Sequence, residues 1–244
     1  MKADPRAQER LLELQAHDLR LAQLERLERD LPERVALEAL ASERTTVRAD
    51  LASTTGVLED ARAELRRTEA DVAVVEARIA KDAERMMSAS SAKDAAGFEH
   101  EIASLRRRQA DLEEIELAVM ERVEEHEAAV AELEQQLTDL QTELQLAAAT
   151  VDGALSRIAD ERAEVAAARA ALAAELPEDL VALYERQRAR YGVGASLLRG
   201  GVSSASGVAL LADELARVRA AAPDDVLLCS SSEAILVRTA ESGL

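Results

Sequence analysis

The chain has 244 residues and a formal net charge of −18, and 32% of its residues are charged while only 1% are aromatic. Aromatic rings normally supply much of a thick globular core, so their scarcity excludes a core of that kind. The acidic charge opposes nonspecific binding of the whole surface to nucleic acid or to an anionic membrane. Ala, Leu, Glu and Arg are abundant, as is typical of long helices, and we therefore expect a mainly α protein.

Two prolines mark the limits of the first predicted helix. Asp4 is a good N-cap, and Pro5 is tolerated at the first helical position, where its missing N–H costs nothing. Pro32 removes a backbone hydrogen bond and restricts the residue before it, so we expect a kink near Pro32. Between the prolines, a stripe at helical spacing is formed by Leu14, His17, Leu21, Leu24, Leu27 and Leu31.

Apolar residues recur every seven positions in two long segments. The outgoing segment covers residues 33–87, and the returning helix is predicted to begin near Asp94 and to end at Glu175. Between them, residues 88–97 are rich in serine and hold a glycine, so we expect the chain to reverse there. This pattern predicts an antiparallel coiled-coil hairpin within residues 1–190. The predicted facing pairs are Ile79 with Leu105, Val72 with Leu112, Leu65 with Val119, and Leu51 with Leu133.

The periodicity changes after the hairpin. Residues 177–190 are predicted to form a short helix at its base, and residues 191–244 a small α+β module. Within the module we expect a strand at 208–211 and a short helix that ends before Pro223. Two β-branched runs then predict a hairpin, formed by residues 226–228 and 235–237 around a turn at 229–234.

A module of this size usually needs a disulfide or a structural metal to be stable. A zinc ion held by two C-x-x-C knuckles is a common solution. Two segments have the required spacing but the wrong residues. Ser203 and Ser206 stand at the ends of the first, and Cys229 and Ser232 at the ends of the second. Hydroxyls do not deprotonate near neutral pH and bind zinc poorly. We therefore expect these four residues to bind no metal, and we expect no other cofactor.

Several stretches make the chain resemble a known bacterial family. They are residues 10–15, 93–108, 183–188 and 235–238, and the similarity runs from end to end. The family consists of coiled-coil proteins with a C-terminal C4-type zinc ribbon, the DUF164 group, and this chain is most similar to its actinobacterial branch. The resemblance implies zinc-ligating cysteines at the positions of Ser203, Ser206, Cys229 and Ser232. Only Cys229 is kept, so the module is interpreted as a degenerate zinc ribbon.

No constellation of residues predicts catalysis. The three histidines, His17, His100 and His126, are far apart along the helices, and the serines at 203–206 have no His or Asp at triad spacing. The glycines at 192–194 and 200–201 lack the Lys and the spacing of a phosphate-binding loop. We therefore expect a protein that is not an enzyme.

Two functions remain open. The first is a scaffold or adaptor that binds protein partners, as a monomer or weak dimer; the second is a regulatory protein that binds RNA or DNA through the C-terminal module. The single cysteine and the lack of a signal core or membrane span favour a cytoplasmic protein with no membrane partner. The candidate partner-binding residues are basic: Lys93, Arg106, Arg107, Arg199, Arg217, Arg219 and Arg238.

Overall fold

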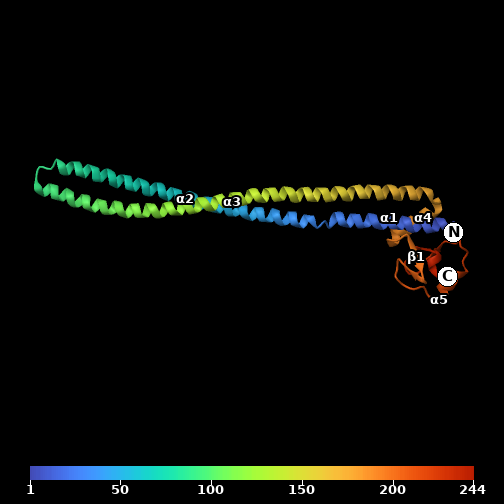
Figure 1. The fold of residues 1–244 in the computed structure, drawn as a ribbon. Coiled ribbons are helices and arrows are strands. Elements are labelled where there is room, and N and C mark those ends of the chain that lie inside the picture. Colours follow the sequence, from blue (N-terminus) through green and yellow to red (C-terminus); the bar gives the residue numbers. More distant parts are fainter. The chain divides into compact units, whose positions relative to one another are not determined.

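The computed structural model describes all 244 residues, and the chain is mainly helical with a small C-terminal sheet, as predicted (Figure 1). The helices are α1 (Pro5–Arg29), α2 (Glu33–Met87), α3 (Ala92–Glu175), α4 (Glu178–Tyr191), α5 (Ala212–Ala220) and the 3-10 helix η1 (Ala240–Ser242). The strands are β1 (Ala195–Arg199), β2 (Val202–Ser203), β3 (Leu227–Leu228) and β4 (Ile235–Val237). None of the helices combines the length and the apolar character that crossing a membrane requires.

The chain forms two compact units. One comprises Met1–Pro32 together with Thr150–Leu244, and the other comprises Glu33–Ala149. The boundary predicted at residue 190 does not coincide with this division, because residues on both sides of it share one core. Ile235 and Val237 of the C-terminal sheet pack in the same cluster as Leu11 of α1.

In the unit of residues 33–149, α2 and the first part of α3 pair as antiparallel helices. Residues of α2 that come later in the chain contact residues of α3 that come earlier. Glu64 pairs with Arg122, whereas Arg78 pairs with Glu101 at 3.3 Å. Every residue of the predicted heptad stripes in these segments is buried or half-buried. The antiparallel hairpin is therefore confirmed.

The turn of the hairpin is shorter than predicted. Only residues 88–91 lie outside the helices, and residues 92–97 belong to α3. Ser91, rather than Asp94, caps the helix, because the Asp94 N–H donates to Ser91 Oγ at 3.1 Å. The Ser91 hydroxyl in turn donates to Asp94 Oδ2 at 2.7 Å, so the two side chains close the cap together. The predicted start of the returning helix is thus two residues late, and Lys93 lies in its first turn.

In the other unit, α1 pairs with the last part of α3. Arg10 contacts Glu175 at 2.6 Å and Arg20 contacts Glu161 at 2.6 Å, again in opposite directions along the two helices. The predicted start at Asp4 and Pro5 and the break at Pro32 are confirmed. The predicted apolar stripe is wrong at Leu27, whose side chain is 46% exposed.

The C-terminal sheet has the strand order β2-β1-β4-β3. The predicted hairpin is confirmed as β3 and β4, which pair antiparallel with Leu228 opposite Ile235. The strand predicted at 208–211 is wrong: these residues form only an isolated bridge between Val202 and Ala209 and then lead into α5. The central strand β1, parallel to β4, was not predicted.

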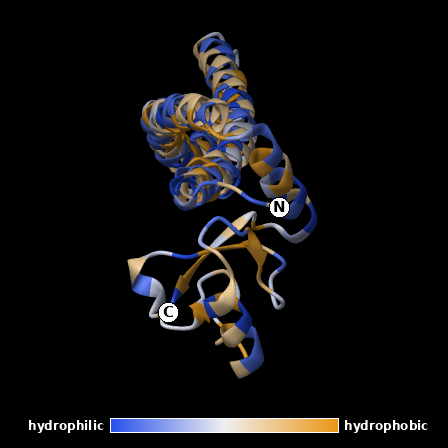
Figure 2. Ribbon diagram, turned by 90° about the vertical axis from the view of Figure 1, so that its right-hand side faces the viewer, coloured by the Kyte–Doolittle hydropathy of each residue, from blue (hydrophilic) through white to orange (hydrophobic).

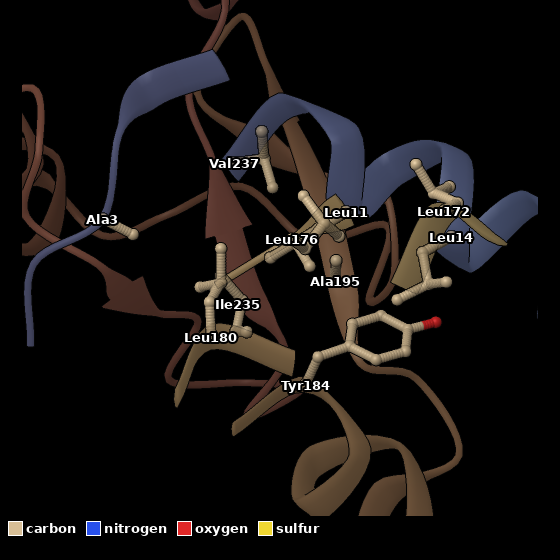
Figure 3. Packing of buried hydrophobic residues seen from close by; sticks show 10 residues of the cluster. All are labelled: Ala3, Leu11, Leu14, Leu172, Leu176, Leu180, Tyr184, Ala195, Ile235 and Val237. Carbon is tan, nitrogen blue, oxygen red and sulfur yellow. The ribbon is translucent and has the colours of Figure 1, made fainter. Parts of the chain in front are cut away.

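Apolar residues gather on the strands of the module (Figure 2). One face of the sheet packs on helices of the same unit, with the aromatic ring of Tyr184 among aliphatic side chains (Figure 3). The cluster consists of Ala3, Leu11, Leu14, Leu172, Leu176, Leu180, Tyr184, Ala195, Ile235 and Val237. A second cluster is formed by Leu198, Val218, Cys229 and Leu236. The module therefore has an apolar core of its own and shares another with the base of the helices.

Candidate functional site

The four positions at which the family resemblance implies zinc ligands lie in two turns with the same backbone hydrogen bonds. In the first, the Gly207 N–H donates to the Ser203 carbonyl at 2.8 Å, and the Ser203 N–H donates to the Val208 carbonyl at 3.1 Å. In the second, the Glu233 N–H donates to the Cys229 carbonyl at 2.7 Å. The Cys229 N–H completes the pattern by donating to the Ala234 carbonyl at 2.9 Å.

The fifth residue of each turn has left-handed backbone geometry. Gly207 has a φ of 67° and Glu233 a φ of 57°. Glycine adopts this geometry without strain, whereas a residue with a Cβ pays roughly 1–2 kcal/mol. Glu233 is the only residue other than glycine with a positive φ. The second turn therefore keeps its geometry despite an unfavourable residue.

Inside the turns, the side chain of Cys229 is buried. Cys229 is 1% exposed and Ser203 is fully buried. Burial alone would raise the pKa of the Cys229 thiol. The polar groups of the two turns, among them the Ser203 hydroxyl and the backbone N–H groups of Ser231 and Ser232, outweigh burial and lower that pKa below its ordinary value of 9.0. Ser203 Oγ also lies 2.7 Å from Ser196 Oγ, which extends the network into β1.

The donor set does not fit a structural zinc ion. Three of the four positions offer hydroxyls, and Ser206 already uses its oxygen to accept the Val208 N–H at 3.2 Å. Structural zinc sites use thiolates and imidazoles in a closed tetrahedral shell. No group of three or more His, Cys, Asp or Glu residues could hold a metal ion elsewhere in the chain.

A second polar cluster joins the module to the helices at its base, and sequence reasoning missed it. Gln15 of α1 accepts, on Oε1, the backbone N–H of Gly194 at 2.8 Å and that of Ala195 at 3.2 Å. The Tyr184 hydroxyl lies 3.3 Å from the same oxygen and donates to Asp18 Oδ2 at 2.6 Å. We call these residues of α1, α4 and the start of β1 the base lock.

The ring of Tyr184 lies against the backbone at Gly194, where only a residue without a side chain fits. A Cβ at this position would lie 2.4 Å from the ring, a contact that real structures do not tolerate. Tyr184 and Leu180 are fully buried. The sequence signal for this contact was present, since residues 183–188 are one of the stretches that carry the family resemblance, but nothing in it shows that the tyrosine meets Gln15.

Comparison with known proteins agrees with this architecture. Residues 14–192 match the CT398-like coiled coil hairpin domain. The chain belongs to the CT398-like hairpin family. Two Mycobacterium tuberculosis proteins, MT2288 and Rv2229c, are each 36% identical to it over 239 residues, which cover 98% of both chains.

Solved structures show the same hairpin fold. A protein of Mycobacterium smegmatis is 38% identical, with a TM-score of 0.83 over 98% of this chain and 100% of its own. CT398 of Chlamydia trachomatis is 16% identical and has a TM-score of 0.63, with 96% and 98% of the two chains covered. At that identity the likeness shows the fold alone. In this CT398-like hairpin, Gln15, Asp18 and Tyr184 of the base lock lie within the matched region, whereas Gly194 lies just beyond it.

Charged groups enclose the base lock of the hairpin. Arg169 of α3 contacts Asp18 at 3.1 Å and also pairs with Glu185, which Arg188 contacts at 2.8 Å. Burial would raise the pKa of Glu185, but its hydrogen bonds to the two arginines outweigh burial and lower that pKa below its ordinary 4.5. The carboxylate form of Glu185 therefore stabilises the folded hairpin base.

This arrangement gives a pH-dependent prediction. A carboxyl group with a lowered folded pKa adds stability above its unfolded pKa and loses it as the pH falls through the folded value. We expect Glu185→Gln to reduce the free energy of unfolding by about 1 kcal/mol at neutral pH, since the group is partly exposed. The difference from the unmodified chain should vanish in acid, well below pH 4.5. Urea unfolding at several pH values measures it, with the exposed Glu164→Gln in α3 as the control; a difference that persists in acid would contradict the assignment.

The hairpin places the seven predicted partner-binding residues in different surroundings. Arg238 has a structural role, because its guanidinium donates to five backbone carbonyls in and just after the end of α5, including that of Ala222 at 2.7 Å. Arg199 pairs with Glu241, and Arg217 pairs with Asp213. The remaining four, Lys93, Arg106, Arg107 and Arg219, are exposed and form no ion pair. These four remain predictions.

Proposed function

We propose that the chain is a non-enzymatic scaffold that holds protein partners through its hairpin and its C-terminal module. The base lock is the observation that carries this proposal. One side-chain oxygen of Gln15 accepts the two backbone N–H groups with which the module begins, and Tyr184 covers the junction. A module attached by buried hydrogen bonds keeps a fixed orientation on its helices, as a scaffold requires, whereas a flexible linker would let it move.

We further propose that the module folds without a structural metal. Two apolar clusters and the backbone hydrogen bonds of the two matching turns hold it together. In this proposal, these interactions take the place of the binding free energy that structural zinc contributes to the folding of small domains, which is on the order of 10 kcal/mol. Elemental analysis of protein purified without chelators should find zinc far below one ion per chain. Stoichiometric zinc would overturn this part of the proposal.

The scaffold is tested by capture from extracts of cells that naturally contain the chain. Lys93→Glu changes an exposed cation near the turn of the hairpin, and Arg219→Glu changes one on α5 of the module. A scaffold with two binding surfaces predicts two groups of captured proteins, each lost from only one variant. Arg44→Glu, at an exposed position of α2 with no ion pair, serves as the control and should keep both groups.

Capture from the same extracts also distinguishes a protein scaffold from a protein that binds RNA or DNA. Binding to RNA or DNA would disappear after nuclease treatment and would weaken steeply with salt, because cations are released from the phosphate backbone. Capture that survives nuclease, together with no gel shift of RNA or DNA oligonucleotides at low salt, is expected for the scaffold. A salt-dependent gel shift that Arg219→Glu abolishes would contradict it.

A further inference from the structure

A groove lies on the C-terminal module, between α5 and the outer strand β3. It encloses about 150 Å³, and its walls are mostly aliphatic, with Val218 of α5 on one side and Leu227 and Leu228 of β3 on the other. Its two charged lining residues, Glu214 and Arg217, have opposite signs, so the groove has no net charge. A cavity of about 150 Å³ with aliphatic walls holds a group the size of a benzene ring. The groove therefore fits one apolar side chain of the size of Leu or Phe.

The backbone N–H and C=O groups of Leu228 point away from the sheet. Leu228 lies opposite Ile235 of β4, yet the Ile235 N–H donates to the Gly194 carbonyl at 2.9 Å, on the side of β1. In an antiparallel ladder, two residues that lie opposite each other either exchange both hydrogen bonds or point their backbone groups away from each other. Leu228 and Ile235 are a pair of the second kind, so the groups of Leu228 face the outer edge of β3. Leu228 is 42% exposed, and no hydrogen bond joins its backbone to a segment on that side.

The same edge already pairs with an extended segment, which is the N-terminus of the chain itself. The Val226 N–H donates to the Met1 carbonyl at 3.1 Å, and the Ala3 N–H donates to the Asp224 carbonyl at 2.8 Å, in an antiparallel arrangement. This pairing ends at Val226. Leu228 is two residues further on, and residues two apart in a strand point their backbone groups to the same side. The outer edge therefore continues from a paired part into an unpaired part, and the unpaired part borders the groove.

We propose that this edge binds an extended segment of a partner protein, which pairs with Leu228 and places an apolar side chain in the groove. The proposal rests on the scaffold function and names the chemistry of the partner that the module holds. Side chains of a strand alternate between the two faces of a sheet. Leu236 packs with Val218 of α5, whereas Ile235, the residue opposite Leu228, packs in the cluster on the other face. A partner residue on either side of the one that pairs with Leu228 therefore points toward α5 and the groove.

An extended segment fits this edge better than a helix does. A helix uses its backbone groups internally, so it would cover the Leu228 N–H and C=O without pairing them, which is unfavourable. An extended segment pairs both groups and leaves alternate side chains free to enter pockets. Nucleic acid is disfavoured, because a groove with one cation and one carboxylate offers no excess of positive charge to phosphates. The expected occupant is therefore an uncharged extended segment with one residue of the size of Leu or Phe.

The test selects binders from a random peptide library displayed on phage, with the full chain as bait. Selected peptides should share an apolar residue of the size of Leu or Phe, and a saturating synthetic copy should slow hydrogen exchange of the Leu228 amide about tenfold or more. N-methylation of each backbone nitrogen of the peptide in turn removes one donor at a time. At the position that pairs with the Leu228 carbonyl, it should lower affinity about fivefold to tenfold. This measurement leaves the chain itself unchanged.

Two variants of the chain change the groove and the edge separately. Ser230→Leu places a larger side chain at an exposed residue that lines the groove, so it should lower peptide affinity about tenfold while the module stays folded. Ser231→Leu is the matched control, because Ser231 is the exposed neighbour in the same turn but does not line the groove. It should bind as the unmodified chain does. Leu228→Pro removes the outward N–H, a change that edge strands tolerate, and should lower affinity about fivefold to tenfold.

Three results would overturn the assignment of the edge and the groove. They are peptide binding that Ser230→Leu leaves unchanged, peptide binding without slower exchange at the Leu228 amide, and selection of no peptide at all. In the last case, a concentration-dependent dimer that Leu228→Pro abolishes would show that a second copy of the chain occupies the edge instead. The scaffold would still stand if the extract experiment shows proteins lost only from Lys93→Glu or only from Arg219→Glu. Failure of both experiments would remove the scaffold as well.

Discussion

Tyr184→Ala is expected to reduce the free energy of unfolding of the unit formed by residues 1–32 and 150–244 by about 3–5 kcal/mol. Tyr184 is fully buried in the cluster of α1, α3, α4 and the sheet, and its removal leaves a cavity that the surrounding helices cannot fill completely. The loss also removes the donor to Asp18 and exposes the junction at Gly194. A change of this size is a large part of the stability of most domains.

Two further variants separate the parts of this effect. Tyr184→Phe keeps the ring and removes the donor at 2.6 Å from Asp18, so it should cost about 1–3 kcal/mol. Gly194→Ala keeps the tyrosine but drives a methyl group into its ring, which should cost about 1–3 kcal/mol or more. If the base lock fixes the module, both variants should speed hydrogen exchange at Ile235 and Val237, which lie on β4 in the shared core.

Tyr191→Ala is the matched control. Tyr191 ends α4, is 43% exposed, and contacts Arg190, whose guanidinium carbon lies 5.3 Å from the ring centre. Exposed cation–π contacts contribute about 0.5–1 kcal/mol, so the control should stay within that range. Urea unfolding combined with hydrogen exchange of β4 amides measures all four variants. Equal effects of Tyr184→Ala and Tyr191→Ala would show that the base lock does not hold the module.

The helical part of the fold was predictable because its causes are local. Heptad spacing fixes which residues face the partner helix. Pro32 and Pro177 interrupt the helices by removing backbone donors, whereas Pro5 marks the first position of α1. Even here, one local detail was missed. Ser91 caps α3, so the serine-rich stretch that predicted a long turn in part begins the helix instead.

The base lock and β1 were not predictable in the same way, since their causes are distant in sequence. Gln15 is an ordinary polar residue of a charged helix until the structure brings it to the N–H groups of Gly194 and Ala195. Residues 195–199 contain one short apolar pair, and they become the central strand only because β2 and β4 pair with them on both sides. Spacing predicted the four positions at 203, 206, 229 and 232, but not that their two turns keep the same backbone hydrogen bonds.

Because the two turns have the same backbone hydrogen bonds, three substitutions should create a zinc site between them. We expect the triple variant Ser203→Cys, Ser206→Cys and Ser232→Cys, which keeps the native Cys229, to bind one zinc ion per chain. The backbone hydrogen bonds of both turns already exist, and the side chains at the first position of each turn, Ser203 and Cys229, are both buried. Four thiolates form a closed tetrahedral shell, and structural zinc has an apparent binding free energy of about 10–16 kcal/mol in small peptides.

The measurements for this variant are zinc content, the visible spectrum of the cobalt-substituted protein and thermal unfolding with and without a chelator. The zinc-loaded variant should melt well above the unmodified chain and lose that gain when the chelator is added. Glu233→Gly added to the triple variant should raise stability by a further 1–2 kcal/mol or so, since it relieves the φ of 57°.

The matched control carries Ser204→Cys, Ser230→Cys and Ser231→Cys, which place the same number of thiols in the same two turns but outside the four ligand positions. It should show neither the tetrahedral cobalt spectrum nor a chelator-sensitive melting temperature. If the triple variant binds zinc no better than this control, the two turns do not point their first and fourth residues at a common centre. The likeness of the two turns would then be limited to their backbones, and the chain would lack the side-chain geometry of a four-thiolate site as well as three of its donor atoms.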